Sequence, residues 1–198
     1  MSTAQLVRDR VDSAPVRSFL SPADVQGPQR AVECELSRLA ADGDVIRVRK
    51  GLYWKGPMTA VGMALPRPIE VGLVVAGPGS GPAGLTALVH LGLTTQVPAV
   101  ETIAVPGRAP TAPTGVRFVS RSIERRVRHL EPIEVAVIEV LRDGPTPMEA
   151  PWDAFARILR RLSADHEIRP EVLAAQLGDE HHVAARSRWQ QLDWTAQR

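Results

Sequence analysis

Four basic side chains close to one glycine turn are the clearest chemical signal in this sequence of 198 residues. Residues 45–55 contain no acidic residue, and their basic members are Arg47, Arg49, Lys50 and Lys55. Cationic side chains without carboxylates beside them can pair with phosphate oxygens. The segment therefore predicts contact with nucleic acid, even though the formal charge of the whole chain is only +2.

The elements around this basic segment follow from hydrophobic spacing and turn residues. Apolar side chains recur at helical intervals on either side of a Ser21-Pro22 pair, which is typical of a helix start. Lys50-Gly51 separates two short apolar-rich runs and predicts a hairpin. The predicted elements are, in order, a helix (4–12), one helical turn (22–25), a longer helix (28–41) and two strands (45–49 and 52–54).

This order is typical of a winged helix-turn-helix, in which the third helix enters the major groove of DNA and the hairpin meets phosphates. The residues expected nearest the bases or the backbone are Gln29, Arg30, Glu33, Ser37 and Arg38, with Arg47, Arg49, Lys50 and Lys55 on phosphates. The alternative is a small helix-and-strand module used for dimerisation or packing, whose basic hairpin is simply solvated.

The remaining sequence predicts a second domain of different character. We expect an α+β chain with the winged helix-turn-helix over residues 1–57 and a C-terminal domain over residues 58–198. That domain divides into a small mixed α/β part at about 69–121 and a largely helical part at about 131–198. Its predicted elements are a helix or strand (69–76), helices (85–91, 132–143, 152–163, 170–177 and about 179–194) and strands (101–105 and 116–120).

Three features could be taken for an enzyme site, and we interpret each as structural. Residues 79–84 read GSGPAG, a G-x-G-x-x-G pattern, but the proline removes a backbone donor and the helix that follows is short, so we expect a flexible turn. His181 and His182 are adjacent on a predicted helix and point apart, which predicts a solvated pair. Cys34 has no recognisable base partner. We expect no catalytic residue, metal or cofactor.

Two groups of arginines form candidate partner-binding surfaces. One follows the strand at 116–120, and the other lies on the outer face of the helix at 152–163. Because arginine pairs bidentately with carboxylate and phosphate, the first group could contact a protein or RNA, and it could equally be a solvated surface. The second group is a further candidate face for a protein partner. The first group is Arg121, Arg125, Arg126 and Arg128, and the second is Arg157, Arg160 and Arg161.

Composition predicts a soluble protein of the reducing cytoplasm. Its single cysteine cannot form an internal disulfide framework, and no apolar run approaches the roughly 18 residues of a membrane span. The first ten residues are polar and mixed in charge, unlike a signal peptide.

Two short motifs resemble those of AbiEi-type antitoxins. Residues 51–56, GLYWKG, resemble the GLYW or GLYY ending of the wing in that family, and residues 87–98, ALVHLGLTTQVP, resemble its LGL(S/T)TQVP motif in the same order. The resemblance covers the chain from about residue 21 to the C-terminal helices and transfers no catalytic residue.

The resemblance implies an antitoxin of a bacterial toxin-antitoxin or abortive-infection system. Its winged helix would bind inverted repeats in the promoter and repress its own operon, and its C-terminal domain would counteract a nucleotidyltransferase-like toxin of the AbiEii type. Two alternatives remain: a module that holds the toxin without binding DNA, and an antitoxin that modifies the toxin enzymatically, for instance by phosphorylation. The second has no nucleotide site in the sequence to support it.

Overall fold

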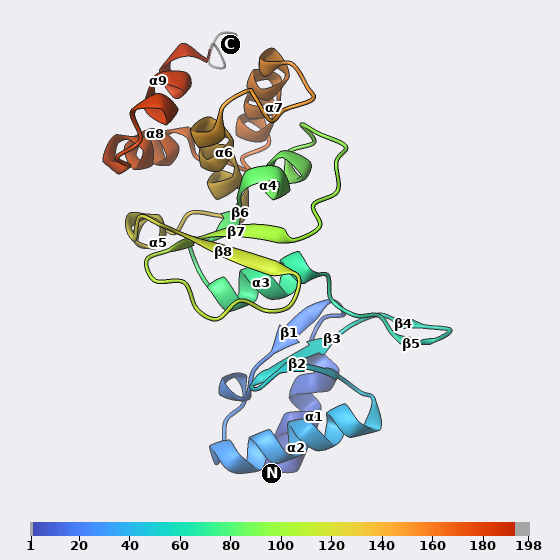
Figure 1. Cartoon of the computed structure of the whole chain (residues 1–198). Coiled ribbons are helices and arrows are strands. Elements are labelled where there is room, and N and C mark those ends of the chain that lie inside the picture. The colour runs from blue at the N-terminus through green and yellow to red at the C-terminus, as the bar shows by residue number, and fades with distance from the viewer. Residues whose placement is uncertain (1, 193–198) are drawn as a thin grey trace. The chain divides into compact units, whose positions relative to one another are not determined.

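The computed structural model describes residues 2–192, which divide into two compact units with the boundary between Arg67 and Pro68 (Figure 1). Both units mix helices and strands, so the chain is of mixed α and β composition. Residues 58–67, expected in the second domain, belong to the first unit. The indole Nε1 of Trp54 donates to the carbonyl of Ala64 at 2.9 Å, and the Ala64 amide donates to Pro57 at 2.9 Å, which ties this segment to the preceding strand.

The first unit contains every element expected of residues 1–57, with boundaries that differ by one residue. Its elements are α1 (Thr3–Ser13), β1 (Ser18–Leu20), the 3-10 turn η1 (Pro22–Asp24), α2 (Gln29–Asp42), β2 (Ile46–Arg49), β3 (Leu52–Lys55), β4 (Met58–Thr59) and β5 (Gly62–Met63). Strand β3 lies between β1 and β2 and is antiparallel to both, while β4 and β5 form a separate small hairpin. The pairing of β1 with β3 was not predicted, because three residues are too few to show alternation.

The apolar stripes of α1 and α2 meet on one face of the sheet and form the core of the first unit. Val7 and Val11 of α1 pack with Val32 and Leu36 of α2, and all four are buried. Gly43 ends α2 in the left-handed region, with a φ of +88°, where a residue without a β-carbon is favoured. The opposite face of α2 is thereby left exposed.

The second unit has a three-stranded sheet with helices on both faces. Its elements are α3 (Pro68–Ala76), β6 (Gly81–Pro82), α4 (Gly84–His90), β7 (Glu101–Pro106), β8 (Val116–Arg121), α5 (Glu124–Val127), α6 (Pro132–Asp143), α7 (Trp152–Ala164), α8 (Pro170–Asp179) and α9 (Val183–Gln191). Strand β7 is central, antiparallel to β6 and parallel to β8. The ambiguous segment at 69–76 is a helix. The last helix begins four residues later than predicted, and its predicted end at Trp194 lies outside the described residues.

Alternate residues of β7 face two different cores. Ile103 and Val105 pack with Ala76 of α3 on one face, while Ala104 belongs to the larger core that α4, α6 and α7 share on the other (Figure 1). This alternation is expected of a strand buried on both faces.

The expectation of a flexible turn at residues 79–84 is wrong. Gly81 and Pro82 form β6, pair with β7 and are buried. A β-carbon on Gly81 would lie 2.5 Å from the β-carbon of Val135 in α6 and 2.6 Å from the Pro132 carbonyl oxygen. The glycine therefore permits the close approach of β6 to α6.

Candidate nucleic-acid interface

The turn between β2 and β3 presents three unpartnered cations. Arg47 and Arg49 are exposed on β2, and Lys50 is exposed in the turn. Their side chains make no hydrogen bond or ion pair with any residue of the described range 2–192. The three charges are therefore available to an external anion.

The prediction that Lys55 is the fourth phosphate contact is wrong, because its ammonium group is bound within the protein. Its Nζ donates to the carbonyl oxygens of Val11, Asp12 and Ala14 at 2.7, 2.9 and 2.9 Å. These three bonds use all the protons of the ammonium group and satisfy carbonyls at the C-terminal end of α1, where the helix dipole also favours a cation. Lys55 is thus part of the packing between β3 and α1.

All five residues of α2 that were predicted to contact DNA are exposed, and four of them keep groups that are not held by an ion pair. Gln29, Arg30, Glu33 and Ser37 are all exposed. The Gln29 amide donates to Glu33 Oε1 at 3.2 Å, and the Ser37 hydroxyl lies 3.2 Å from that of Tyr53. Arg30 makes no side-chain hydrogen bond or ion pair with residues 2–192.

The fifth residue, Arg38, is held by carboxylates instead of being free. It donates to Asp42 at 2.6 Å and to both oxygens of Glu35, one of which also accepts from Arg8 of α1 at 3.1 Å. The hydrogen bond from Arg38 is the largest cause that lowers the pKa of Glu35 from 4.5 to about 2. Arg38 and Arg8 thus link α1 to α2, and the prediction that Arg38 contacts DNA is not supported by its surroundings.

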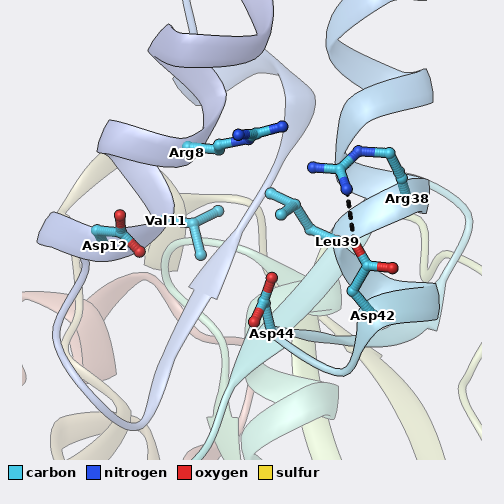
Figure 2. Close-up of a pocket in the computed structure, with 7 residues that line it drawn as sticks. All are labelled: Arg8, Val11, Asp12, Arg38, Leu39, Asp42 and Asp44. Atoms are coloured by element: carbon cyan, nitrogen blue, oxygen red, sulfur yellow. Dashed lines mark hydrogen bonds and ion pairs between the residues drawn. The ribbon is translucent and has the colours of Figure 1, made fainter.

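A polar pocket of about 310 Å³ lies beside this link, between α1 and α2. Figure 2 shows the guanidinium groups of Arg8 and Arg38 extending into it from opposite helices, with the Arg38–Asp42 ion pair dashed. Asp12, Asp42 and Asp44 also line it. The mixed charges of its lining are consistent with a solvated notch between paired helices.

In the second unit, the prediction of an exposed arginine cluster after β8 is wrong for Arg125. Its side chain is 0% exposed, its Nε donates to Glu180 at 2.5 Å, and its Nη1 lies 2.8 Å from Glu139 at an angle that makes an ion pair and not a hydrogen bond. Arg121 binds both oxygens of Glu139, at 2.9 and 2.7 Å. Arg142 completes the group by donating to Glu180 at 2.7 Å.

The other two arginines of this cluster are also engaged. Arg128 donates to Gln176 at 3.1 Å and pairs with Asp179. Arg126 is exposed, and its guanidinium reaches the Pro106 carbonyl at 3.3 Å. The carboxylates that hold this cluster come from α6 and α8, far along the chain, and no local pattern around residues 121–128 could have predicted them.

The arginines of α7 differ in whether their side chains have partners within the protein. Arg157 pairs with Asp153 at 2.5 Å, both side chains being largely exposed, and Arg160 reaches the carbonyl of Ala156 at 3.4 Å. Arg161 is exposed, and its side chain makes no hydrogen bond or ion pair within residues 2–192. Exposed ion pairs of this kind are weak, so the α7 face remains accessible.

The structure shows what the polar residues of the motif at residues 87–98 contact. The spacing of the motif did not predict these contacts. Glu149 accepts from the backbone and the hydroxyl of Thr95 at 2.8 and 3.0 Å, and from Gln96 at 3.1 Å. These bonds lower the pKa of Glu149 from 4.5 to about 2, the Thr95 backbone contributing most. The motif thus fastens the loop before β7 to the loop between α6 and α7.

The histidine pair and the cysteine that were considered for metal binding or catalysis show no such site among the described residues. His182 caps α9 by accepting from the Ala185 amide at 3.1 Å, so the predicted solvated histidine pair is wrong for this residue. Cys34 is exposed on α2. Across residues 2–192, no three His, Cys, Asp or Glu side chains are grouped so as to hold a metal, and no helix is long and apolar enough to cross a membrane.

Comparisons with known proteins leave the function to be argued from these residues. No family model matches the sequence, and no curated protein matches it. A solved structure that resembles it is that of the Rv2827c protein from Mycobacterium tuberculosis, which is 18% identical, with a TM-score of 0.44. The match covers 96% of this chain and 75% of that one.

Proposed function

We propose that the protein is a DNA-binding antitoxin of the AbiEi type that represses its own promoter. In this proposal the first unit is a winged helix-turn-helix, with α2 as the recognition helix and the β2–β3 hairpin as the wing. The order of its elements and the placement of β3 between β1 and β2 support this assignment, because both are typical of that motif.

The observation that carries the proposal is the group of three unpartnered cations on the wing. Arg47, Arg49 and Lys50 lie on the hairpin that follows α2, and no carboxylate of the described residues neutralises them. Phosphate contacts release bound counterions, so three such contacts give an affinity that falls steeply with salt. A hairpin used only for packing would gain nothing from three exposed like charges within the acid-free segment 45–55.

The second half of the proposal is neutralisation of a nucleotidyltransferase-like toxin of the AbiEii type by the second unit. It is supported by the resemblance of residues 51–56 and 87–98 to that antitoxin family. Because the arginines at 121–128 are mostly held internally, the α7 face with Arg157, Arg160 and Arg161 is the better candidate surface for the toxin.

The test of DNA binding is fluorescence anisotropy of the full chain with its own upstream DNA and with a scrambled duplex of equal length, each at two salt concentrations. We expect tighter binding to the upstream duplex and a steep loss of affinity with salt for both. Absence of binding to either duplex would leave the alternative of a module that holds the toxin without touching DNA. Co-purification of the toxin with the wild-type chain and with an Arg157→Ala, Arg161→Ala variant then tests the α7 face.

A further inference from the structure

The packing of α2 leaves few side chains that could read bases. Arg38 is bound to Glu35 and Asp42, and Gln29 is bound to Glu33. In the centre of the exposed face, Cys34, Ser37 and Ala41 are short. Arg30 and Glu33 are therefore the charged side chains of the N-terminal half of the helix whose hydrogen-bonding groups remain free within residues 2–192, beside the amide of Gln29.

We infer that α2 reads two neighbouring G·C pairs of its DNA site, with Arg30 on a guanine and Glu33 on a cytosine. This inference rests on the proposed function and specifies the bases that the same surface recognises. The short side chains beside Arg30 and Glu33 favour this inference, because they let the helix come close to the floor of the major groove.

Arg30 suits guanine because of its geometry and its freedom. The guanidinium can donate two parallel hydrogen bonds to the O6 and N7 acceptors of guanine in the major groove. Arg30 has no partner within residues 2–192 and lies in the first turn of α2, the end of a recognition helix that typically meets base edges. Binding it to guanine therefore breaks no internal contact.

Glu33 suits cytosine because a carboxylate can only accept hydrogen bonds. One oxygen accepts from Gln29, and the other is free within the described chain. In a complex with DNA a carboxylate is repelled by phosphates, so it is better placed against a base donor, and the cytosine amino group is the donor that acidic side chains typically contact. Residues 30 and 33 are separated by a rise of about 4.5 Å along the helix. Because this is similar to the rise of roughly 3.4 Å between base pairs, the two side chains are close enough together for contacts on neighbouring pairs.

The experiment is selection of duplexes from a random library by the full chain, followed by affinity measurements on the selected duplex and its single-pair variants. We expect the selected site to contain neighbouring G·C pairs, and replacement of the contacted guanine to weaken wild-type binding by roughly 5- to 150-fold. Arg30→Ala should lose this discrimination. Arg30→Lys should recover affinity through its charge and retain a weaker guanine preference than the wild-type chain, because lysine can donate to O6 and N7 but lacks the planar pair of donors. Glu33→Gln should lose the preference for the cytosine only.

The matched control is Arg47→Ala, which removes one wing charge. It should weaken binding to all duplexes alike and leave the selected sequence unchanged. The inference is overturned if the selected site lacks the two G·C pairs, or if Arg30→Ala and Glu33→Gln select the wild-type sequence. Salt-sensitive binding without sequence enrichment would overturn the inference and retain DNA binding, whereas loss of all binding by the wild-type chain would overturn both.

Discussion

The ammonium group of Lys55 in β3 lies 2.7 Å from the carbonyl oxygen of Val11 in α1, although 44 positions separate the two residues. Two further carbonyls of the same helix end accept from it, so Lys55 closes α1 and joins it to the sheet. Lys50, five residues earlier, has no such contact within residues 2–192. Two lysines of one hairpin thus have different roles.

Lys55→Met should destabilise the protein, because it removes the three hydrogen bonds that the ammonium group donates to carbonyl oxygens at the end of α1. Hydrogen bonds to a charged group contribute about 1.5–3 kcal/mol, and we expect a loss of this order in the free energy of unfolding. Urea unfolding followed by circular dichroism measures it, with Lys50→Met as the control that should change stability by no more than about 0.5 kcal/mol. If the two variants were equally stable, the capping role of Lys55 would be refuted.

Arg49→Ala combined with Lys50→Ala should weaken binding to every DNA sequence alike. Each lost phosphate contact removes about 0.9 from the slope of log K against log salt, so the slope should flatten by roughly 1.8. A double variant of Arg157 and Arg161 removes the same charge from the second unit and should leave the slope unchanged. Unaltered affinity in the wing variant would remove the hairpin from the DNA interface.

The fold of the first unit was predictable because its signals are local. The stripe of Val32, Leu36 and Leu39 defines the buried face of α2, and Lys50-Gly51 marks the turn of the hairpin. The exposed face of α2 followed directly from that stripe. The strand pairing of β1 was missed because it depends on β3, which lies more than thirty residues along the chain.

The free or engaged state of each cation was not predictable. A sequence pattern shows that Arg38, Lys55 and Arg125 are basic, but it does not show which carboxylate or carbonyl folds against them. Glu180 lies 55 residues from Arg125, and the pair forms only when α5 and α8 pack together. Candidate phosphate contacts from sequence therefore need the tertiary structure to separate capping and buried cations from available ones.

Arg125→Met should be among the most destabilising substitutions in the second unit. It removes a fully buried cation and leaves Glu139 and Glu180 partly uncompensated. Breaking a buried ion pair in this way typically costs about 3–5 kcal/mol, which urea unfolding would detect. Arg126→Met, one residue along and exposed, should cost far less. Equal effects of the two substitutions would show that burial of Arg125 contributes nothing specific.

Glu149→Gln should lower the free energy of unfolding at neutral pH. It should also make that free energy fall less when the pH is lowered. The pKa of Glu149 is about 2 in the folded chain and 4.5 ordinarily, so the ionised form is favoured by folding. Its stabilising contribution is therefore complete above about pH 4.5 and is lost as the pH falls toward 2. Urea midpoints at pH 3 and pH 7 should differ less in Glu149→Gln than in the wild-type chain.

Glu167→Gln is the control, since this exposed side chain makes no hydrogen bond or ion pair within residues 2–192. If the control reduced the difference equally, the acid sensitivity would arise from overall charge, and the contacts of Glu149 with Thr95 and Gln96 would not be its source.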